Sequence, residues 1–357
     1  MAVTIKGKLL PLPILQGGMG VGVSLDGLAG AVAACGGMGT LSTALCGYDE
    51  PDFSQHPRQA NLRALDKQVR RAKELSGGAG LVAVNAMVAT AQYADSVRTA
   101  LRAGADAIVC GAGLPRDLPA LAAEVPESDA ALAPVVSSGR AAGLICRLWD
   151  RHYGYIPDFI VLEGPLAGGH LGFSAPDLAH PPALSALLHD VLTALAPYRE
   201  KAGRDIPVFV AGGVKDGKEM AQYMKEGAAG AQFATRFIPT AECDASLAYK
   251  QRLLDAKEED IVLVKSPVGM PGRALNSPLI QRVQAGTQPK PQGCIKCLAA
   301  CDPKTAPYCI SKALIAARNG DWDNGLFFCG ANGGTLVRMS TVGEQMEQIM
   351  KEWNDAQ

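Results

Sequence analysis

Eight short apolar runs, each followed by small or polar residues and then by a helical pattern, constrain the fold of this chain most. The runs expected to form strands span residues 13–18, 38–42, 80–85, 107–110, 133–137, 159–162, 207–211 and 230–233. The segments expected to form the intervening helices span residues 24–34, 58–75, 90–103, 118–124, 140–149, 182–202 and 216–226. Such regular alternation predicts a parallel sheet.

The number of units decides which parallel sheet is expected. Eight units favour a closed (β/α)8 barrel, and an open doubly wound sheet is the alternative. In a barrel, the carboxyl ends of all strands surround one mouth, where we expect a ligand. The residues at these strand ends are Gly17, Asn85, Gly111, Ser137, His170, Gly212 and Thr235.

The alternation stops after Thr240, which suggests two parts. We expect residues 1–240 to form the barrel and residues 241–357 to form a cysteine-rich helical extension that packs on it. The extension holds a Gly/Pro-rich segment, Ser266 to Pro278, and a final helix, Thr341 to Trp353. Within the barrel, Ser24 precedes a helical pattern and is predicted to be its N-cap.

Composition and charge argue against nucleic-acid binding, membrane insertion and secretion. Hydrophobic residues make up 48% and charged residues 19% of the 357 residues, which suits a large buried core. The net charge of -1 does not favour nucleic acid or anionic membranes as partners. No apolar run approaches the length of about 18 residues that a membrane span needs. The N-terminal segment lacks a secretory cleavage pattern, so we expect a cytoplasmic protein.

The stretch EGPLAGGHLGF, residues 163 to 173, is the strongest local signal of chemistry. It follows a strand-like run and places His170 directly after two glycines. A titratable ring at a strand end, where the backbone lacks side chains, can hold a proton beside a flat ligand. The alternative is a glycine turn with a histidine that only caps local structure.

Two late loops indicate an anion site. Residues 208–220 and 230–237 are strand-to-helix turns rich in small residues. Such turns leave backbone N–H groups free and direct a helix N-terminus at an anion. The pair follows strands seven and eight, where barrels commonly bind phosphate. Ordinary tight turns are the alternative, and Arg236 either adds charge or forms a surface pair.

Six motifs together resemble the nitronate monooxygenase (2-nitropropane dioxygenase) superfamily, which includes FMN-dependent enoyl-acyl-carrier-protein reductases. The resemblance covers roughly residues 10 to 280 and implies a TIM barrel with non-covalent FMN. The motifs are QGGMG (16–20), VNAMV (84–88), EGPLAGGHLG (163–172), VAGGV (210–214), AQFATRFIPTAEC (231–243) and SPVGMPGRALNS (266–277).

The resemblance also implies roles for single residues. His170 matches the catalytic base or proton donor of the family. The matching cofactor-binding positions are Gly17, Gly18 and Met19 against the flavin, Asn85 after the third strand, and Gly212, Gly213, Ala234 and Thr235 at the phosphate. We add Ser137, Glu163, Gly168 and Gly169 to this set. The chain departs from the family at Leu166, where glutamate is usual, at Ala234, where glycine is frequent, and at Gly18, where proline is common.

The ten cysteines fall into two groups. Six are scattered in mostly apolar surroundings and are predicted to be small core residues. Four form a C-x2-C-x3-C-x7-C pattern, namely Cys294, Cys297, Cys301 and Cys309. This spacing resembles the [4Fe-4S] segments of other FMN barrel reductases, so we favour an iron–sulfur cluster over zinc or free thiols. Such a cluster would either transfer electrons to the flavin or serve only to stabilise the structure of the extension.

Three functions are compatible with these features. The first is a nitronate monooxygenase type of reaction, with substrate on the flavin and His170 handling a proton. The second is reduction of an enoyl thioester with electrons from NAD(P)H or a ferredoxin-like protein. The third is a non-catalytic electron-transfer or sensor flavoprotein. A small-molecule substrate is the expected partner, and a homodimer is left open. Lys265, Ser266 and Arg273 lie either over the pocket, as in the family, or in a surface loop.

Overall fold

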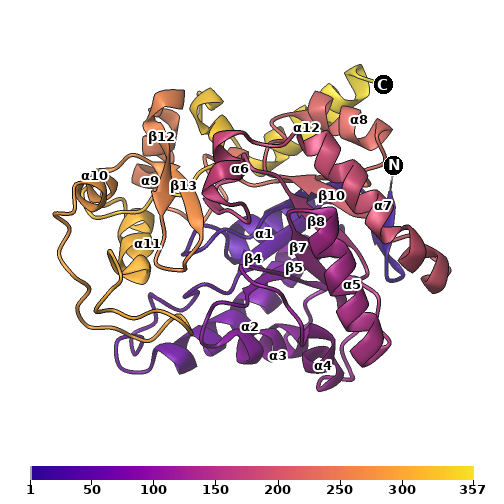
Figure 1. Ribbon diagram of the computed structural model, residues 1–357, viewed down its shortest axis with the longest axis horizontal. Coiled ribbons are helices and arrows are strands. Elements are labelled where there is room, and N and C mark those ends of the chain that lie inside the picture. The colour runs from indigo at the N-terminus through magenta and orange to yellow at the C-terminus, as the bar shows by residue number, and fades with distance from the viewer. Residues whose placement is uncertain (1) are drawn as a thin grey trace.

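The computed structural model describes residues 2–357 and contains a closed barrel of eight parallel strands (Figure 1). Each strand pairs with the next barrel strand along the chain, and the last pairs with the first. The barrel strands are β3 (Ile14–Gln16), β4 (Met38–Ser42), β5 (Leu81–Met87), β6 (Ala107–Gly111), β7 (Ala131–Val136), β8 (Ile160–Glu163), β10 (Val208–Ala211) and β11 (Gly230–Phe233). The predicted (β/α)8 barrel is therefore confirmed, and the open-sheet alternative is wrong.

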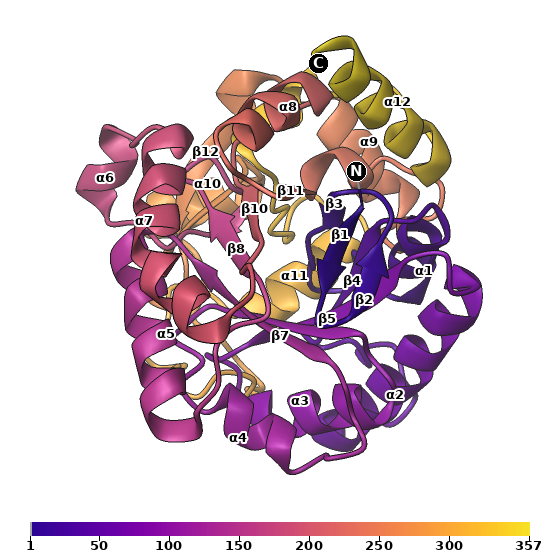
Figure 2. The same cartoon turned by 90° about the vertical axis from the view of Figure 1, so that its right-hand side faces the viewer.

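The inside of the barrel is a packed core. Alternate residues of each strand point inward, as the two-residue period of a strand requires, and Phe159 and Phe209 meet edge to face at 5.9 Å. An antiparallel hairpin of β1 (Val3–Ile5) and β2 (Lys8–Leu10) covers the amino-terminal end of the barrel (Figure 2). Its Ile5 and Leu10 pack into the same interior cluster. The opposite, carboxyl end stays available for a ligand.

Helices surround the barrel, and the chain's last helix completes their ring. Helices α12 and α8 pack together, and α12 also contacts α1, so the C-terminus fills the gap after the eighth strand (Figure 2). A side chain at Gly217 in α8 would overlap the backbone of Ile349 in α12, which shows how closely the two helices approach. The ring consists of α1 (Asp26–Ala34), α2 (Pro57–Ser76), α3 (Tyr93–Arg102), α4 (Leu118–Ala123), α5 (Gly139–Tyr153), α7 (Leu184–Ala202), α8 (Gly217–Lys225) and α12 (Val342–Asp355).

The remaining extension lies across the carboxyl end of the barrel (Figure 1). Its strands β12 and β13 form an antiparallel sheet with β9, the two-residue strand that contains His170. The remaining elements are β9 (Gly169–His170), α6 (Ala175–Ala179), α9 (Leu247–Leu254), β12 (Ile261–Lys265), β13 (Pro271–Leu275), α10 (Pro278–Gln284), α11 (Ile310–Arg318) and three 3-10 turns at 235–237, 258–260 and 331–335. The predicted cysteine-rich extension is confirmed, whereas the division at residue 240 stays a prediction. Among residues 2–357, no helix combines the length and apolarity that crossing a membrane would require.

The N-cap predicted for the first barrel helix is wrong. Ser24 caps nothing, because its hydroxyl accepts a hydrogen bond from Met19 N at 2.8 Å. The carboxylate of Asp244 instead accepts from Leu25 N at 2.7 Å and from two further amides of α1 at 3.2 Å. A residue from the extension therefore satisfies the helix start, where a negative charge is favourable.

We expect Asp244→Ala to lower the free energy of unfolding by about 2 kcal/mol, because three amide donors at the start of α1 lose their acceptor. Chemical denaturation followed by circular dichroism measures the loss. Asp323→Ala, at an exposed carboxylate, is the control. Equal stability of the two variants would contradict this account of the cap.

Candidate active site

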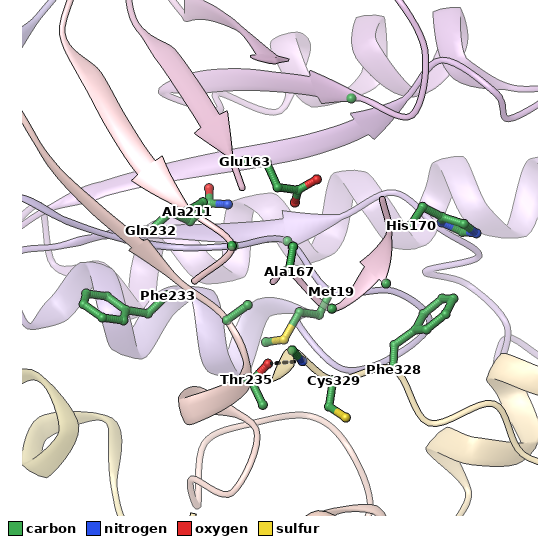
Figure 3. A pocket seen from close by; sticks show the side chains of 18 of the residues that line it. Met19, Glu163, Ala167, His170, Ala211, Gln232, Phe233, Thr235, Phe328 and Cys329 are labelled. Atoms are coloured by element: carbon green, nitrogen blue, oxygen red, sulfur yellow. Dashed lines mark hydrogen bonds between the residues drawn. The ribbon is translucent and has the colours of Figure 1, made fainter. Parts of the chain in front are cut away.

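A cavity of about 330 Å³ opens at the carboxyl end of the barrel (Figure 3). Its volume lies in the range of small-molecule and cofactor sites. The residues predicted to bind a cofactor all line it, as does His170. They are Gly17, Gly18, Met19, Asn85, Ser137, Glu163, Gly168, Gly169, Gly212, Gly213, Ala234 and Thr235. The barrel thus brings the predicted residues together, while their role in binding FMN stays a prediction.

The first glycine segment lies close against the neighbouring strands. A side chain at Gly18 would overlap Cβ of Asn85, which explains why this position carries no larger residue. The backbone of Met19 is held by Ser24, which bonds to both its N–H and its carbonyl oxygen. Backbone and the side chain of Asn85 therefore form a fixed wall at this side of the cavity.

The other end of the cavity suits a phosphate. Gly212 and Gly213 have positive φ values of 69° and 153°, which glycine adopts readily. Within residues 2–357, the backbone N–H groups of Gly213, Ala234 and Thr235 donate to no protein acceptor. Unsatisfied amides beside strand ends bind anions well, so this donor set fits the phosphate of FMN.

His170 occupies a partly buried position at the opposite side of the cavity. Its Nε2 lies 2.8 Å from the hydroxyl of Ser266, and its ring meets Phe328 edge to face at 5.2 Å. Burial lowers the pKa of His170 to about 4, so the ring is neutral at physiological pH. A neutral imidazole with one hydrogen-bonded nitrogen can accept a proton from a substrate.

The contact with Ser266 remains possible in both tautomers of His170. The Ser266 hydroxyl also accepts from Val268 N at 3.3 Å, which fixes the oxygen and leaves its hydrogen free to rotate. The hydroxyl can therefore donate to an unprotonated Nε2 or accept from a protonated one. Ser266 is 4% exposed, so water does not compete strongly for this contact.

Arg273 holds the glycine loop that carries His170. Its guanidinium is 8% exposed and donates to the carbonyl oxygens of Pro165 and Ala167 at 2.8 and 2.6 Å. Its backbone also pairs with Gly169 in the three-stranded sheet. The surface-loop alternative for this segment is therefore wrong for Ser266 and Arg273, whereas Lys265 is exposed.

Glu163 projects into the cavity from the end of β8 (Figure 3). Among residues 2–357, its carboxyl group has no hydrogen-bond partner, and burial raises its pKa to about 7. A carboxyl group with this pKa exchanges its proton near neutral pH. Glu163 is therefore a second proton-carrying group in the cavity, besides His170.

Several residues that the sequence did not single out also line the cavity, and three of them are consecutive. Phe328, Cys329 and Gly330 come from the segment before α12, and Gly330 N donates to the hydroxyl of Thr235 at 2.8 Å. Burial raises the pKa of Cys329 to about 12, so its thiol stays protonated. The sequence shows an apolar run at residues 326–330, which by itself does not reveal the distant contact with β11.

The core role predicted for the scattered cysteines is confirmed for five of them, which are buried, whereas Cys35 is partly exposed. The four grouped cysteines lie in the connection between α10 and α11. Cys294 is exposed and the other three are partly buried, with Cys297 Sγ accepting from Ser311 Oγ at 2.8 Å. Across residues 2–357, no three Cys, His, Asp or Glu side chains are placed to hold a metal ion together. The metal site therefore stays a prediction and is not preassembled.

Comparisons with known proteins agree with this geometry. A family profile described as "Nitronate monooxygenase" matches residues 4–352. A Mycobacterium tuberculosis relative named (3aS,4S,5R,7aS)-5-hydroxy-7a-methyl-1-oxo-octahydro-1H-indene-4-carboxyl-CoA dehydrogenase is 29% identical over 77% of this chain and 66% of its own length. A probable nitronate monooxygenase of Staphylococcus saprophyticus is 32% identical over 35% of this chain and 34% of its own length.

Solved structures give the same fold. FabK from Thermotoga maritima superposes with a TM-score of 0.72 at 25% identity, covering 96% of this chain and 93% of that protein. A nitroalkane oxidase from Streptomyces ansochromogenes has a TM-score of 0.72 at 21% identity and covers 97% of each chain, a likeness of fold alone. The chain spans slightly less than two thirds of the first two curated relatives, at 66% and 65% of their lengths.

The raised pKa of Glu163 predicts a pH effect on stability. In protein stripped of flavin, the unfolded chain loses this proton near pH 4.5, whereas the folded chain keeps it to about pH 7. The free energy of unfolding should therefore fall between these pH values and level off above pH 7, relative to Glu163→Gln. Urea unfolding across this range measures the difference, with Glu127→Gln at an exposed site as control. Parallel curves for the wild type and Glu163→Gln would contradict the buried state of this carboxyl group.

Proposed function

Because this chain belongs to the nitronate monooxygenase family, we propose that it is an FMN-dependent oxidoreductase that acts on a nitronate. That it is an oxidoreductase of this family follows from the match over residues 4–352, which also argues against a non-catalytic sensor. The observation that carries the choice of reaction is the neutral His170, hydrogen-bonded at Nε2 and lining the same cavity as the anion-binding amides. The family implies FMN, and the donor set fits it.

Different residues would bind the cofactor and handle the proton of the substrate. Gly213, Ala234 and Thr235 would bind the phosphate through their amides, and the wall of Gly18 and Asn85 would bound the flat ring. When bound, FMN supplies the acceptor for the electrons of the substrate. His170 accepts or holds a proton or orients the anionic substrate, and the contact of Ser266 with Nε2 keeps its ring in place.

Reduction of an enoyl thioester is the second candidate function. The Mycobacterium tuberculosis relative is named as a dehydrogenase of a CoA ester, and it matches 77% of this chain. In this reaction His170 would lie near the thioester carbonyl or the α-carbon. Electrons would come from NAD(P)H or from a ferredoxin-like protein.

We also propose that two copies of the chain can form a homodimer.

Anaerobic assays separate the two functions. Under argon, we expect the nitronate of nitropropane alone to reduce the bound flavin, as followed by its absorbance. His170→Ala should slow this reduction about 10²–10⁴-fold because it removes the proton-handling group. Ser266→Ala should slow it less and shift its pH profile, because it removes only the partner of Nε2.

His189→Ala, at an exposed histidine, serves as the control and should match the wild type. Turnover of an enoyl thioester with NAD(P)H or reduced ferredoxin, without reduction by the nitronate, would support the second candidate instead. Full activity of His170→Ala would contradict both mechanisms.

We also propose that Cys294, Cys297, Cys301 and Cys309 bind a [4Fe-4S] cluster, with zinc as the alternative. The compact spacing and the four free thiols support this. Burial raises the pKa of Cys301, and the other three cysteines of the group raise it further, so the four lie within electrostatic reach of each other. Binding would have to draw the partly exposed segment together, which would lower these pKa values.

Metal analysis of anaerobically purified protein tests this site. We expect about four iron and four sulfide per chain, lost in Cys301→Ser and kept in Cys35→Ser. About one zinc per chain with the same pattern of loss would indicate the alternative. Absence of both metals from the wild type would show that the thiols are free.

A further inference from the structure

We propose that a second cavity beside the flavin pocket binds an unbranched aliphatic chain carried by the substrate. This inference rests on the proposed function, because it assigns the first cavity to the flavin and to the reacting group. The second cavity has a volume of about 370 Å³ and is bounded by barrel loops and by the cysteine segment, defined here as residues 294–301.

The two cavities adjoin each other at the reactive histidine. They share Ala44, Met87, Ala112, His170 and Leu314 as wall residues. Because His170 borders both, we infer that a substrate that reacts beside its ring extends past this shared wall into the second cavity. The rest of such a molecule would then be the part that the second cavity selects.

The wall of the second cavity matches an aliphatic chain. Its apolar members include Val21, Leu45, Val268, Ile295, Leu298 and Ile310. It contains no phenylalanine, tyrosine or tryptophan on which a flat ring system would stack. A flexible hydrocarbon gains free energy from such a surface by burial alone.

Three polar side chains of this wall are already bound by the protein, whereas Thr43 and the exposed Lys296 also line it. Thr90 donates to Met87 O at 2.8 Å, Asn61 accepts from Gly47 N at 2.9 Å, and Ser311 donates to Cys297 Sγ at 2.8 Å. Around these three side chains a ligand meets mainly apolar groups, and burying a polar group there without a partner would be unfavourable.

The cysteine segment forms one wall of this cavity and is attached to the barrel. Ala91 N donates to Cys297 O and Ala299 N donates to Ala89 O, both at 3.0 Å, so the segment pairs with the loop after β5. Figure 1 shows this gold connection running from α10 toward the loops near α2. Because Cys297 and Leu298 are neighbours in this wall, the segment that carries the grouped cysteines also limits the length of chain that fits.

Two homologous ligand series test the proposal on the flavin-loaded protein. Saturated acyl-CoA thioesters from butanoyl to dodecanoyl represent one source of the chain, and nitronates from nitropropane to nitrodecane represent the other. We expect the dissociation constant, measured by calorimetry, to fall about fourfold for each added methylene until the cavity is full. The series that shows this dependence identifies the source.

Substitutions at Leu298 localise the effect. Leu298→Trp should weaken binding of the longest chains about tenfold or more and leave the shortest unchanged, and Leu298→Ala should extend the tolerated length. Leu247→Trp is the matched control, since Leu247 is 74% exposed and lines neither cavity. Because Leu298→Ala only removes volume, it keeps the test valid if the tryptophan variant fails to fold.

The outcomes separate this inference from the proposed function. A dissociation constant that does not change with chain length in either series would overturn the chain-binding cavity, even if turnover were seen. Equal dissociation constants of Leu298→Trp and Leu247→Trp for the longest chains would do the same. Length-dependent binding without any turnover of nitronate or enoyl thioester would leave the cavity standing and overturn the proposed function.

Discussion

The pairing of the last barrel strand with the first is the interaction on which the site depends. Phe233 of β11 lies opposite Gln16 of β3, and Gly17 N donates to Phe233 O at 2.8 Å. This seam closes the sheet and brings the first glycine segment beside the turn at Thr235, where we expect an anion to bind. Without closure, the strand ends would lie along an open edge and could not surround one ligand.

Closure also buries titratable side chains at the cavity and so changes their pKa values. Burial lowers the pKa of His170 and raises that of Glu163, so both side chains favour their uncharged forms. The uncharged imidazole is the form that accepts a proton, and the single contact with Ser266 orients it. The same desolvation that costs folding energy therefore prepares the group that we expect to react.

The C-terminal extension is part of this site and of the barrel's support. Arg273 holds the glycine loop, Phe328 packs on His170, and Gly330 bonds to Thr235. Asp244 satisfies the start of α1 from more than two hundred residues away. Each of these contacts joins segments remote in sequence, so the extension and the barrel depend on each other for their geometry.

The sequence by itself determined the eight strands, most helices and the residues of the mouth, because these depend on local periodicity and on glycines that follow apolar runs. The ring of helices nevertheless takes its last member from α12, and a distant carboxylate replaced the predicted cap at Ser24. Only the tertiary structure decided the partners of His170 and Thr235, since hydrogen bonds between remote segments leave no periodic signal. It also decided the spacing of the four grouped thiols, because side-chain convergence depends on how the connecting loop packs.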